Sequence, residues 1–211
     1  MRHRFKLVAI RTGLKAQVHA VMAKNGVLPA RLEMFGPTGT AQLDALDLAP
    51  AYASRLGSLR SLIDSLDAEI GAFEVEVHRA LRGDAGYMAI QAINGVGPTL
   101  AAMFVAEIGD VHRFPSPKAL CSWAGLTPKH HESDTTLHRG RVTKQGSRLV
   151  RWAAVEAVAR YHGGTKLAAD YQRIAEHRGR FKARVAVARK LLCLVYYGLR
   201  DGEIRALRGA A

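Results

Sequence analysis

The strongest constraint on the fold is a heptad pattern between residues 56 and 77. Apolar residues recur there at alternating spacings of three and four, namely Leu56, Leu59, Ile63, Leu66, Ile70, Phe73 and Val77. No proline interrupts the run, so the pattern predicts one long helix from Pro50 to about Arg82. The stripe is narrower than most globular helix faces. It fits either a hairpin with an earlier helix of the same chain or a coiled coil with a second chain.

A second helix is predicted from Arg2 to Asn25, where apolar residues recur at helical spacing and Gly26 follows as a C-terminal cap. This segment contains no acidic residue. Its cations are Arg2, Arg4, Lys6, Arg11, Lys15 and Lys24. Such a one-signed face favours contact with phosphate or with an acidic partner.

The rest of the chain also reads as helical, with no convincing strand, and the predicted fold class is all-α. Residues 1–83 are expected to form a helical stalk and residues 84–205 a second helical domain. Within the latter we expect helices at residues 87–93, 98–108, 118–124, 147–163, 166–177 and 181–199. The polar segment from Lys129 to Gly146 has no apolar periodicity and is interpreted as a long loop or a poorly ordered hairpin.

The net charge of the chain indicates which class of partner it binds. The formal net charge is +13 over 211 residues, and nucleic acid is the commonest partner for a positive field of this size. No segment reaches the roughly 18 uninterrupted apolar residues of a membrane span, and the N-terminus lacks a signal peptide. Cys121 and Cys193 lie in apolar helical runs, so we expect thiols in a reducing cytoplasm rather than a disulfide.

A glycine hairpin lies between two of the predicted helices, at Gly95-Val96-Gly97. Two glycines allow positive φ and close backbone approach, and Pro98 suits the first turn of the next helix. Backbone amides there can point at an anion beside a helix N-terminus. The segment is similar to a helix-hairpin-helix module, and Gly95, Val96, Gly97 and Thr99 are predicted to contact DNA. An ordinary turn between two helices is the alternative.

Potential metal ligands occur in and just before the polar segment. His130, His131 and Glu132 lie close in sequence, and Cys121 precedes them. Their spacing fits no standard tetrahedral site, so no metal ligand is predicted.

Several short motifs follow one another at close spacing. They are Ile93 to Pro98, Ala106 to Asp110, Arg113-Phe114, Ala124 to Pro128, Arg139 to Gly146 and Leu149 to Arg151. Together they resemble the C-terminal transposase domain of the insertion-sequence 110/116/902 family, the DEDD recombinases that are guided by a bridge RNA and related to pilin-gene invertases. The likeness is strong from about Tyr87 to Arg160. Before it, Leu14 to Val21 resembles the interdomain helices of the family.

The resemblance implies a DNA strand-exchange enzyme in which a serine attacks a DNA phosphate. The matching position is Ser133, and Asp134 stands where the family usually has glycine. Nearby cations could hold phosphates: Lys129, Arg139, Arg141, Lys144, Arg148 and Arg151. Ser147 is interpreted as a helix cap or a phosphate contact.

The family also has an N-terminal RuvC-like domain, whose four carboxylates bind divalent metal. No residues of this chain match that quartet, so we expect no cofactor in this chain and Mg²⁺ only with the missing domain. We expect the chain to be inactive alone, to bind DNA and a guide RNA, and to form a homo-oligomer through the 56–77 seam. The alternatives are a non-catalytic DNA-binding and dimerising module, such as a truncated transposase regulator, and a helix-hairpin-helix accessory protein.

Overall fold

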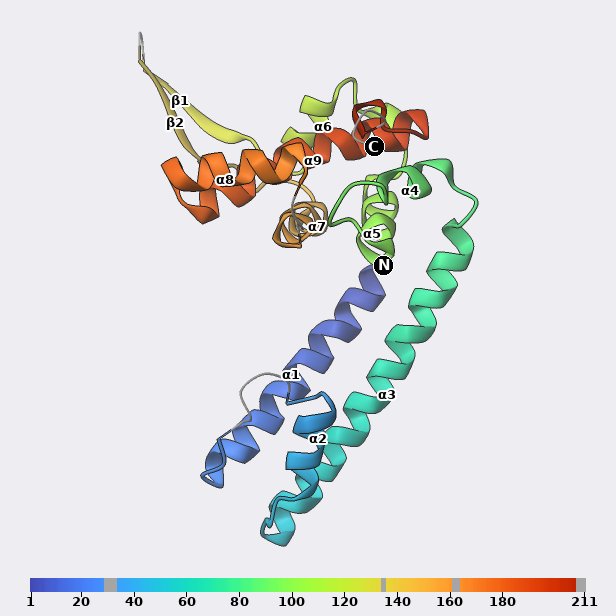
Figure 1. Cartoon of the computed structure of the whole chain (residues 1–211), viewed down its shortest axis with the longest axis vertical. Coiled ribbons are helices and arrows are strands. Elements are labelled where there is room, and N and C mark those ends of the chain that lie inside the picture. Colours follow the sequence, from blue (N-terminus) through green and yellow to red (C-terminus); the bar gives the residue numbers. More distant parts are fainter. Residues whose placement is uncertain (29–33, 134–135, 161–163, 208–211) are drawn as a thin grey trace. The chain divides into compact units, whose positions relative to one another are not determined.

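The structure is a computed structural model that describes residues 1–28, 34–133, 136–160 and 164–207, without the side chains of residues 130–139. The chain forms two compact units, Met1–Glu76 and Val77–Ala211. The boundary predicted between residues 83 and 84 falls just after the long helix, which continues from the first unit into the second. Figure 1 shows the elements in both units.

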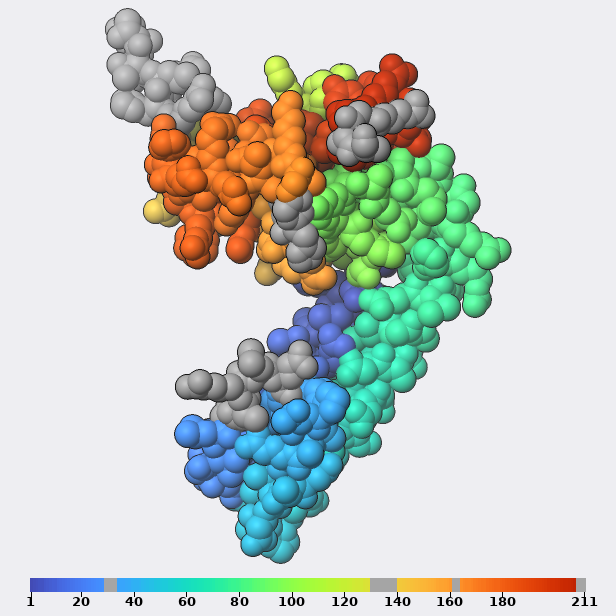
Figure 2. Space-filling model, in the orientation of Figure 1, coloured from blue at the N-terminus to red at the C-terminus, as the bar shows by residue number. Residues whose placement is uncertain are grey.

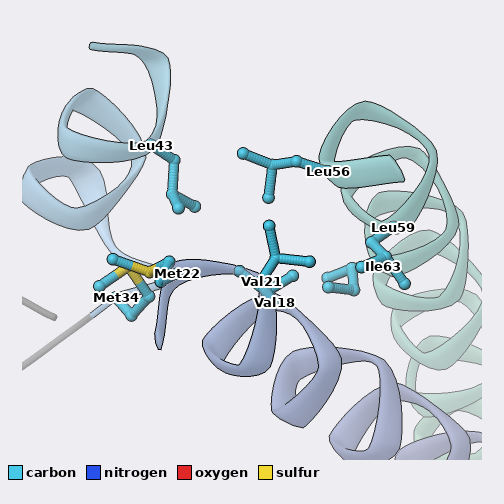
Figure 3. Packing of buried hydrophobic residues seen from close by; sticks show 8 residues of the cluster. All are labelled: Val18, Val21, Met22, Met34, Leu43, Leu56, Leu59 and Ile63. Atoms are coloured by element: carbon cyan, nitrogen blue, oxygen red, sulfur yellow. The ribbon is translucent and has the colours of Figure 1, made fainter. Parts of the chain in front are cut away.

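The first unit is a helical hairpin built from α1 (Arg2–Lys24) and α3 (Pro50–Leu81), with the short α2 (Pro37–Asp44) between them in sequence. The two long helices run antiparallel, because the His3 ring packs edge-on against Phe73 near one end and Arg55 donates to Gln17 near the other. The core of this unit lies where all three helices meet (Figure 3). Its buried residues are Val18, Val21, Met22, Met34, Leu43, Leu56, Leu59 and Ile63.

The heptad seam of α3 therefore packs within the chain. Leu56, Leu59, Ile63 and Ile70 are all at most 6% exposed, and the first three contact residues of α1 and α2. Burial of this seam stabilises the folded unit by about 25 cal/mol for each Å² of apolar surface removed from water. The hairpin within the chain is present, Leu66, Phe73 and Val77 of the seam stay half-buried, and a homo-oligomer through the seam stays a prediction.

Three of the six cations of α1 have partners in the same unit. Arg4 forms an ion pair with Glu74, and Arg11 forms one with Asp67, both on α3. The Lys15 ammonium lies 4.5 Å from the centre of the Phe35 ring. For Arg4 and Arg11, the acidic partner is thus a helix of the same chain, whereas Lys6 and Lys24 are exposed.

The second unit is assembled around α9 (Arg180–Asp201), which contacts α4, α6, α7 and α8. The buried side of α9 consists of Ala183, Val187, Ala188, Leu191, Leu192, Val195, Tyr196 and Gly198. The remaining helices of this unit are α4 (Ala85–Ile90), α5 (Pro98–Ile108), α6 (Pro117–Trp123), α7 (Arg148–Ala159) and α8 (Lys166–Arg178), with short 3₁₀ turns η1 (Val111–Arg113) and η2 (Arg205–Leu207).

The all-α class is confirmed, since the described residues contain nine α-helices and one two-stranded sheet. That sheet corrects the expectation of no strand. The strands β1 (Pro128–Ser133) and β2 (Thr136–Val142) pair antiparallel, with a register irregularity between Pro128 and His130. The sequence of this segment lacks the apolar alternation that reveals most strands. No helix among the described residues has the length and apolar content to cross a membrane.

The two cysteines are free thiols, as expected. Cys121 of α6 is buried, and its sulfur lies 3.8 Å from that of Cys193 on α9. The hydrogen bond between the two thiols, helped by the positive charge of Arg189, lowers the pKa of Cys193 to about 7. The same pairing and burial raise the pKa of Cys121.

Candidate nucleic-acid interface

The glycine hairpin between α4 and α5 is a tight turn that packs against the buried side chain of Tyr87. Tyr87 is fully buried, and its hydroxyl contacts the Pro98 carbonyl at 3.4 Å. Gly95 has φ of +85°, which a residue with a side chain rarely adopts. Gly97 precedes α5 with extended backbone, and Pro98 occupies the first helical turn. Gly97 and Pro98 are exposed, as an anion contact at this helix N-terminus requires.

Val96 has a different position from its two glycine neighbours. Its side chain is 3% exposed, and its amide donates to the Ile93 carbonyl at 2.9 Å. Side chain and amide are both used inside the turn, so Val96 holds the hairpin to the core. Any phosphate contact of this hairpin would come from Gly95, Gly97 and Thr99, and that role stays a prediction.

The base of the β1–β2 hairpin is fixed by two backbone segments that cross at close range. The amide of Thr143 donates to the Thr127 carbonyl at 2.9 Å, and that of Lys144 donates to the Gly125 carbonyl at 3.2 Å. A Cβ on Gly125 would lie 2.3 Å from the Gln145 carbonyl oxygen. Gly125 and Gly146 also have φ of +70° and +75°. Only glycine allows both the approach and the backbone angle.

The start of α7 is built next to this crossing. Ser147 caps the helix, because its hydroxyl accepts from the Val150 amide at 3.2 Å. The same hydroxyl donates to Glu107 of α5 at 3.1 Å. Of the two roles considered for Ser147, the cap is therefore present. Glu107, which the sequence interpretation did not single out, holds the cap in place.

Arg151 of α7 also contacts the two backbone segments that cross at the base of the hairpin. Its guanidinium donates to the Ala124 carbonyl at 2.8 Å and to the Gln145 carbonyl at 3.4 Å. It thereby ties the end of α6 to the segment before α7. These bonds give Arg151 a role in holding the crossing together, whether or not it also reaches a phosphate.

The other predicted cations with described side chains are exposed. They are Lys129, Arg141, Lys144 and Arg148. Lys144 has φ of +57°, an uncommon angle for a residue with a side chain. The crossing of backbones holds it there, so Lys144 extends outward from a fixed point. These four residues surround the base of the hairpin and form an exposed basic group.

Ser133 ends β1, and its backbone is in register with Thr136 of β2. The side chains of Ser133 and Arg139 lie outside the described residues. Their predicted roles are untested by the geometry. His130, His131 and Glu132 also have side chains outside the description, and the described residues hold no group of three or more potential metal ligands.

The helix ends add to the positive field. None of the described helices has an acidic residue in its first turn. Each N-terminus already carries roughly half a positive charge from the aligned peptide dipoles. In α7 this turn also contains Arg148 and Arg151. The carboxylate of Glu107, bonded to the Ser147 cap, offsets part of this positive charge at the start of α7.

Trp152 is a second residue that sequence reasoning missed. It is 38% exposed and lies four residues after Arg148, on the same side of α7. The signal was available, because Trp152 falls outside the buried stripe of α7, which consists of Val150, Ala153, Ala154, Ala157 and Val158. An exposed tryptophan beside an arginine is a suitable surface for a nucleobase or sugar.

Comparison with known families identifies the class. Residues 87–172 match the model of the Transposase IS116/IS110/IS902 family. The matched segment starts at α4, includes the glycine hairpin, the crossing and the β1–β2 hairpin, and ends within α8. The resemblance inferred from the motifs is confirmed over these residues, which are similar to the transposases of that family.

Individual proteins similar to this chain have names that agree with the family match. A probable family 20 transposase of Pseudomonas aeruginosa is 30% identical over 71% of this chain and 46% of its own length. The transposase for insertion sequence element IS1111A of Coxiella burnetii is 26% identical over 89% of this chain and 54% of its own length. A pilin gene-inverting protein of Moraxella bovis is 30% identical over 54% of this chain and 37% of its own length. The chain thus spans about half the length of the curated relatives it matches, or less.

Proposed function

We propose that this chain is the DNA-contacting and serine-contributing part of a DEDD recombinase that acts in DNA transposition or site-specific recombination. The observation that carries the proposal is the family match over residues 87–172. The relatives are named as transposases and as a pilin gene-inverting protein. Because the chain spans about half of their length, the proposed activity belongs to this chain acting with a RuvC-like domain.

Ser133 is the proposed nucleophile. Its hydroxyl would attack a backbone phosphorus and lose its proton to a nearby base. A phosphoserine ester would form while the bond from phosphorus to one strand oxygen breaks. The support is its match to the family serine and its place at the end of β1, in a hairpin whose base is held by the Gly125–Gly146 crossing.

The exposed cations at the hairpin base would hold the phosphates on either side of the reacting one. Lys129, Arg141, Lys144 and Arg148 are exposed, and Arg139 is proposed with them. Contacts to phosphate position the strand without reading its sequence. The helix N-terminus at Gly97 would add a further backbone contact. Affinity of this kind falls steeply with salt.

Mg²⁺ is proposed only with the RuvC-like domain, where it would stabilise charge that develops on the phosphate. The described residues of this chain do not form a metal site, so no step is assigned to a metal here. A guide RNA in a cytoplasmic complex is proposed from the family resemblance alone. We assign no intersubunit role to Leu56, Leu59 and Ile63 of the 56–77 seam, because they are covered by α1 and α2.

One observation favours a second function, a DNA-binding module without catalysis. Asp134 follows Ser133 where the family usually has glycine. A carboxylate there repels a DNA phosphate and restricts the backbone angles that glycine would allow. In that case the chain would bind DNA and form no covalent link.

The two functions separate in one experiment. The chain is incubated with a RuvC-like domain of a relative, Mg²⁺ and labelled DNA, and covalent adducts are resolved on a denaturing gel. We expect Ser133→Ala to abolish the adduct and Thr136→Val, at the paired position of β2, to retain it. An adduct that survives Ser133→Ala refutes the assignment. DNA binding without any adduct supports the second function.

A further inference from the structure

None of the residues predicted to bind DNA lies in the turn between α8 and α9. The two helices are separated by Gly179 alone, which has φ of +83°. The Gly179 amide donates to the Ala175 carbonyl at 2.9 Å, and the Gly179 carbonyl accepts from the Ala183 amide at 3.1 Å. One residue therefore closes both helices and makes a sharp, well-defined corner.

Every residue of this corner is exposed, from Glu176 to Lys182. Phe181 is 85% exposed, the highest value among the large apolar side chains in the described part of the chain. Figure 2 shows α8 and the start of α9 in orange at the surface of this unit. Leaving a phenylalanine in water forgoes roughly 1.5–3 kcal/mol of burial energy. A single exposed phenylalanine is ordinary by itself, so its surroundings decide its meaning.

Those surroundings are cationic. His177, Arg178, Arg180 and Lys182 flank Phe181 along the chain. Arg180 and Lys182 lie in the first turn of α9, which has no side-chain cap and no acidic residue. Cations there oppose the helix dipole at a cost of about 0.3–1 kcal/mol each. A bound anion would remove that cost.

The corner contains one acidic residue, Glu176, beside the cations Arg178, Arg180 and Lys182. The ion pairs of this helical pair lie further along, where Asp170 contacts Arg173 at 3.0 Å and Lys190 at 2.6 Å. These two cations lower the pKa of Asp170. Within the described part of the chain, Arg178, Arg180 and Lys182 form no ion pair. The Asp170 bridge instead ties α8 to α9 and keeps the corner rigid.

We propose that the α8–α9 corner binds single-stranded nucleic acid, with Phe181 stacking on an unpaired base and Arg178, Arg180 and Lys182 contacting the flanking phosphates. An aromatic face among cations is the usual combination for sequence-tolerant binding of single strands. A duplex offers the phosphates but keeps its bases stacked inside. Single strands therefore use Phe181 and duplexes do not. The inference rests on the proposed function only in that nucleic acid is the ligand.

The test is fluorescence anisotropy of the full chain with labelled single-stranded DNA, single-stranded RNA and duplex DNA of equal length. The loss of one stacked base is expected to weaken binding of a single strand about tenfold in Phe181→Ala, with little change for the duplex. Phe181→Tyr should restore single-strand affinity. Because this side chain is almost fully exposed, its variants are expected to melt at the same temperature as the unaltered chain.

Charge variants extend the test. Arg180→Gln and Lys182→Gln should each lower the salt slope of single-strand binding by about 0.7. Lys166→Gln is the matched control, since Lys166 is exposed at the opposite end of α8. The DNA and RNA probes identify which single strand the corner prefers.

Two results would overturn the inference. One is equal loss, or no loss, for single strands and duplex in Phe181→Ala. The other is unchanged nucleic-acid binding while the same variant loses binding to phosphatidylserine vesicles, which would make the corner a membrane contact. Adduct formation at Ser133 is measured separately, so failure of this inference leaves the proposed function standing, and the reverse also holds.

Discussion

The carbonyl oxygen of Trp123 occupies the space where a side chain on residue 146 would begin. A Cβ on Gly146 would lie 1.6 Å from that oxygen. This contact joins the end of α6 to the residue before the Ser147 cap. It fixes both ends of the β1–β2 hairpin at one place. The contact explains in physical terms why the motif at 139–146 ends in glycine, and the approach of Gly125 to Gln145 explains the glycine of the motif at 124–128.

Gly146→Ala should therefore destabilise the second unit by more than about 2 kcal/mol, because it adds a backbone clash to the strain of a positive φ. Gly109 is the matched control. It has φ of +62° but open space where a Cβ would be. Gly109→Ala should cost only about 1–2 kcal/mol of backbone strain. Urea unfolding of both variants makes the comparison, and equal losses would contradict the proposed clash.

Arg151 and Arg148 should behave in opposite ways. Arg151→Met leaves the carbonyls of Ala124 and Gln145 without their charged donor, so we expect a loss of about 1–3 kcal/mol of stability. Arg148→Met should leave stability unchanged and reduce the salt slope of duplex binding by about 0.9. Thermal melts and DNA titrations over a salt series measure both effects. A stable Arg151→Met variant would show that its backbone bonds matter little.

The seam of α3 should respond to mutation as a core and not as an interface. Leu59→Ala removes a side chain that is 6% exposed, and we expect it to cost about 2–5 kcal/mol. Leu62→Ala is the control, because Leu62 is 50% exposed. Sedimentation of the folded protein should show the same oligomeric state for both variants. Dissociation of an oligomer by Leu59→Ala without loss of helix would contradict the hairpin.

Cys193 should react as an acidic thiol. Its pKa of about 7 lies below the usual value of 9.0, so its thiolate fraction should rise through a midpoint near pH 7. Iodoacetamide labelling of the native chain, followed by mass spectrometry, measures this midpoint. Cys121 should stay unlabelled because it is buried with a raised pKa. Cys121→Ala removes the hydrogen-bond donor and should move the midpoint upward, whereas an unchanged midpoint would contradict the pairing.

Local patterns in the sequence predicted the helices well. The spacing of Leu59 and Ile63 predicted α3, and the Asn-Gly-Val-Gly-Pro stretch predicted the turn before α5. What the patterns could not supply was the identity of distant partners. Nothing local to Arg4 indicates that Glu74 lies opposite it, and the same holds for Ser147 and Glu107. The sequence left the β1–β2 segment open between a long loop and a hairpin, because its residues show no apolar alternation.

For the candidate site too, the sequence predicted local features but not contacts between distant residues. Motif matching located the segment and its exposed cations. It could not separate Arg148, which is exposed, from Arg151, whose guanidinium is bonded to two carbonyls. It also could not show that Val96 is buried between two more accessible glycines. Those distinctions depend on which backbone atoms come together in space.

The most direct test of the central claim is to locate the DNA linkage by mass spectrometry. Chain, RuvC-like domain, Mg²⁺ and DNA are combined, the DNA is digested to a residual nucleotide, and the protein is cleaved with trypsin. Cleavage after Lys129 and Arg139 releases residues 130–139, in which Ser133 is the only serine. We predict a nucleotide on Ser133 in this peptide. A nucleotide on Ser147, Thr135 or Thr136 would contradict the account.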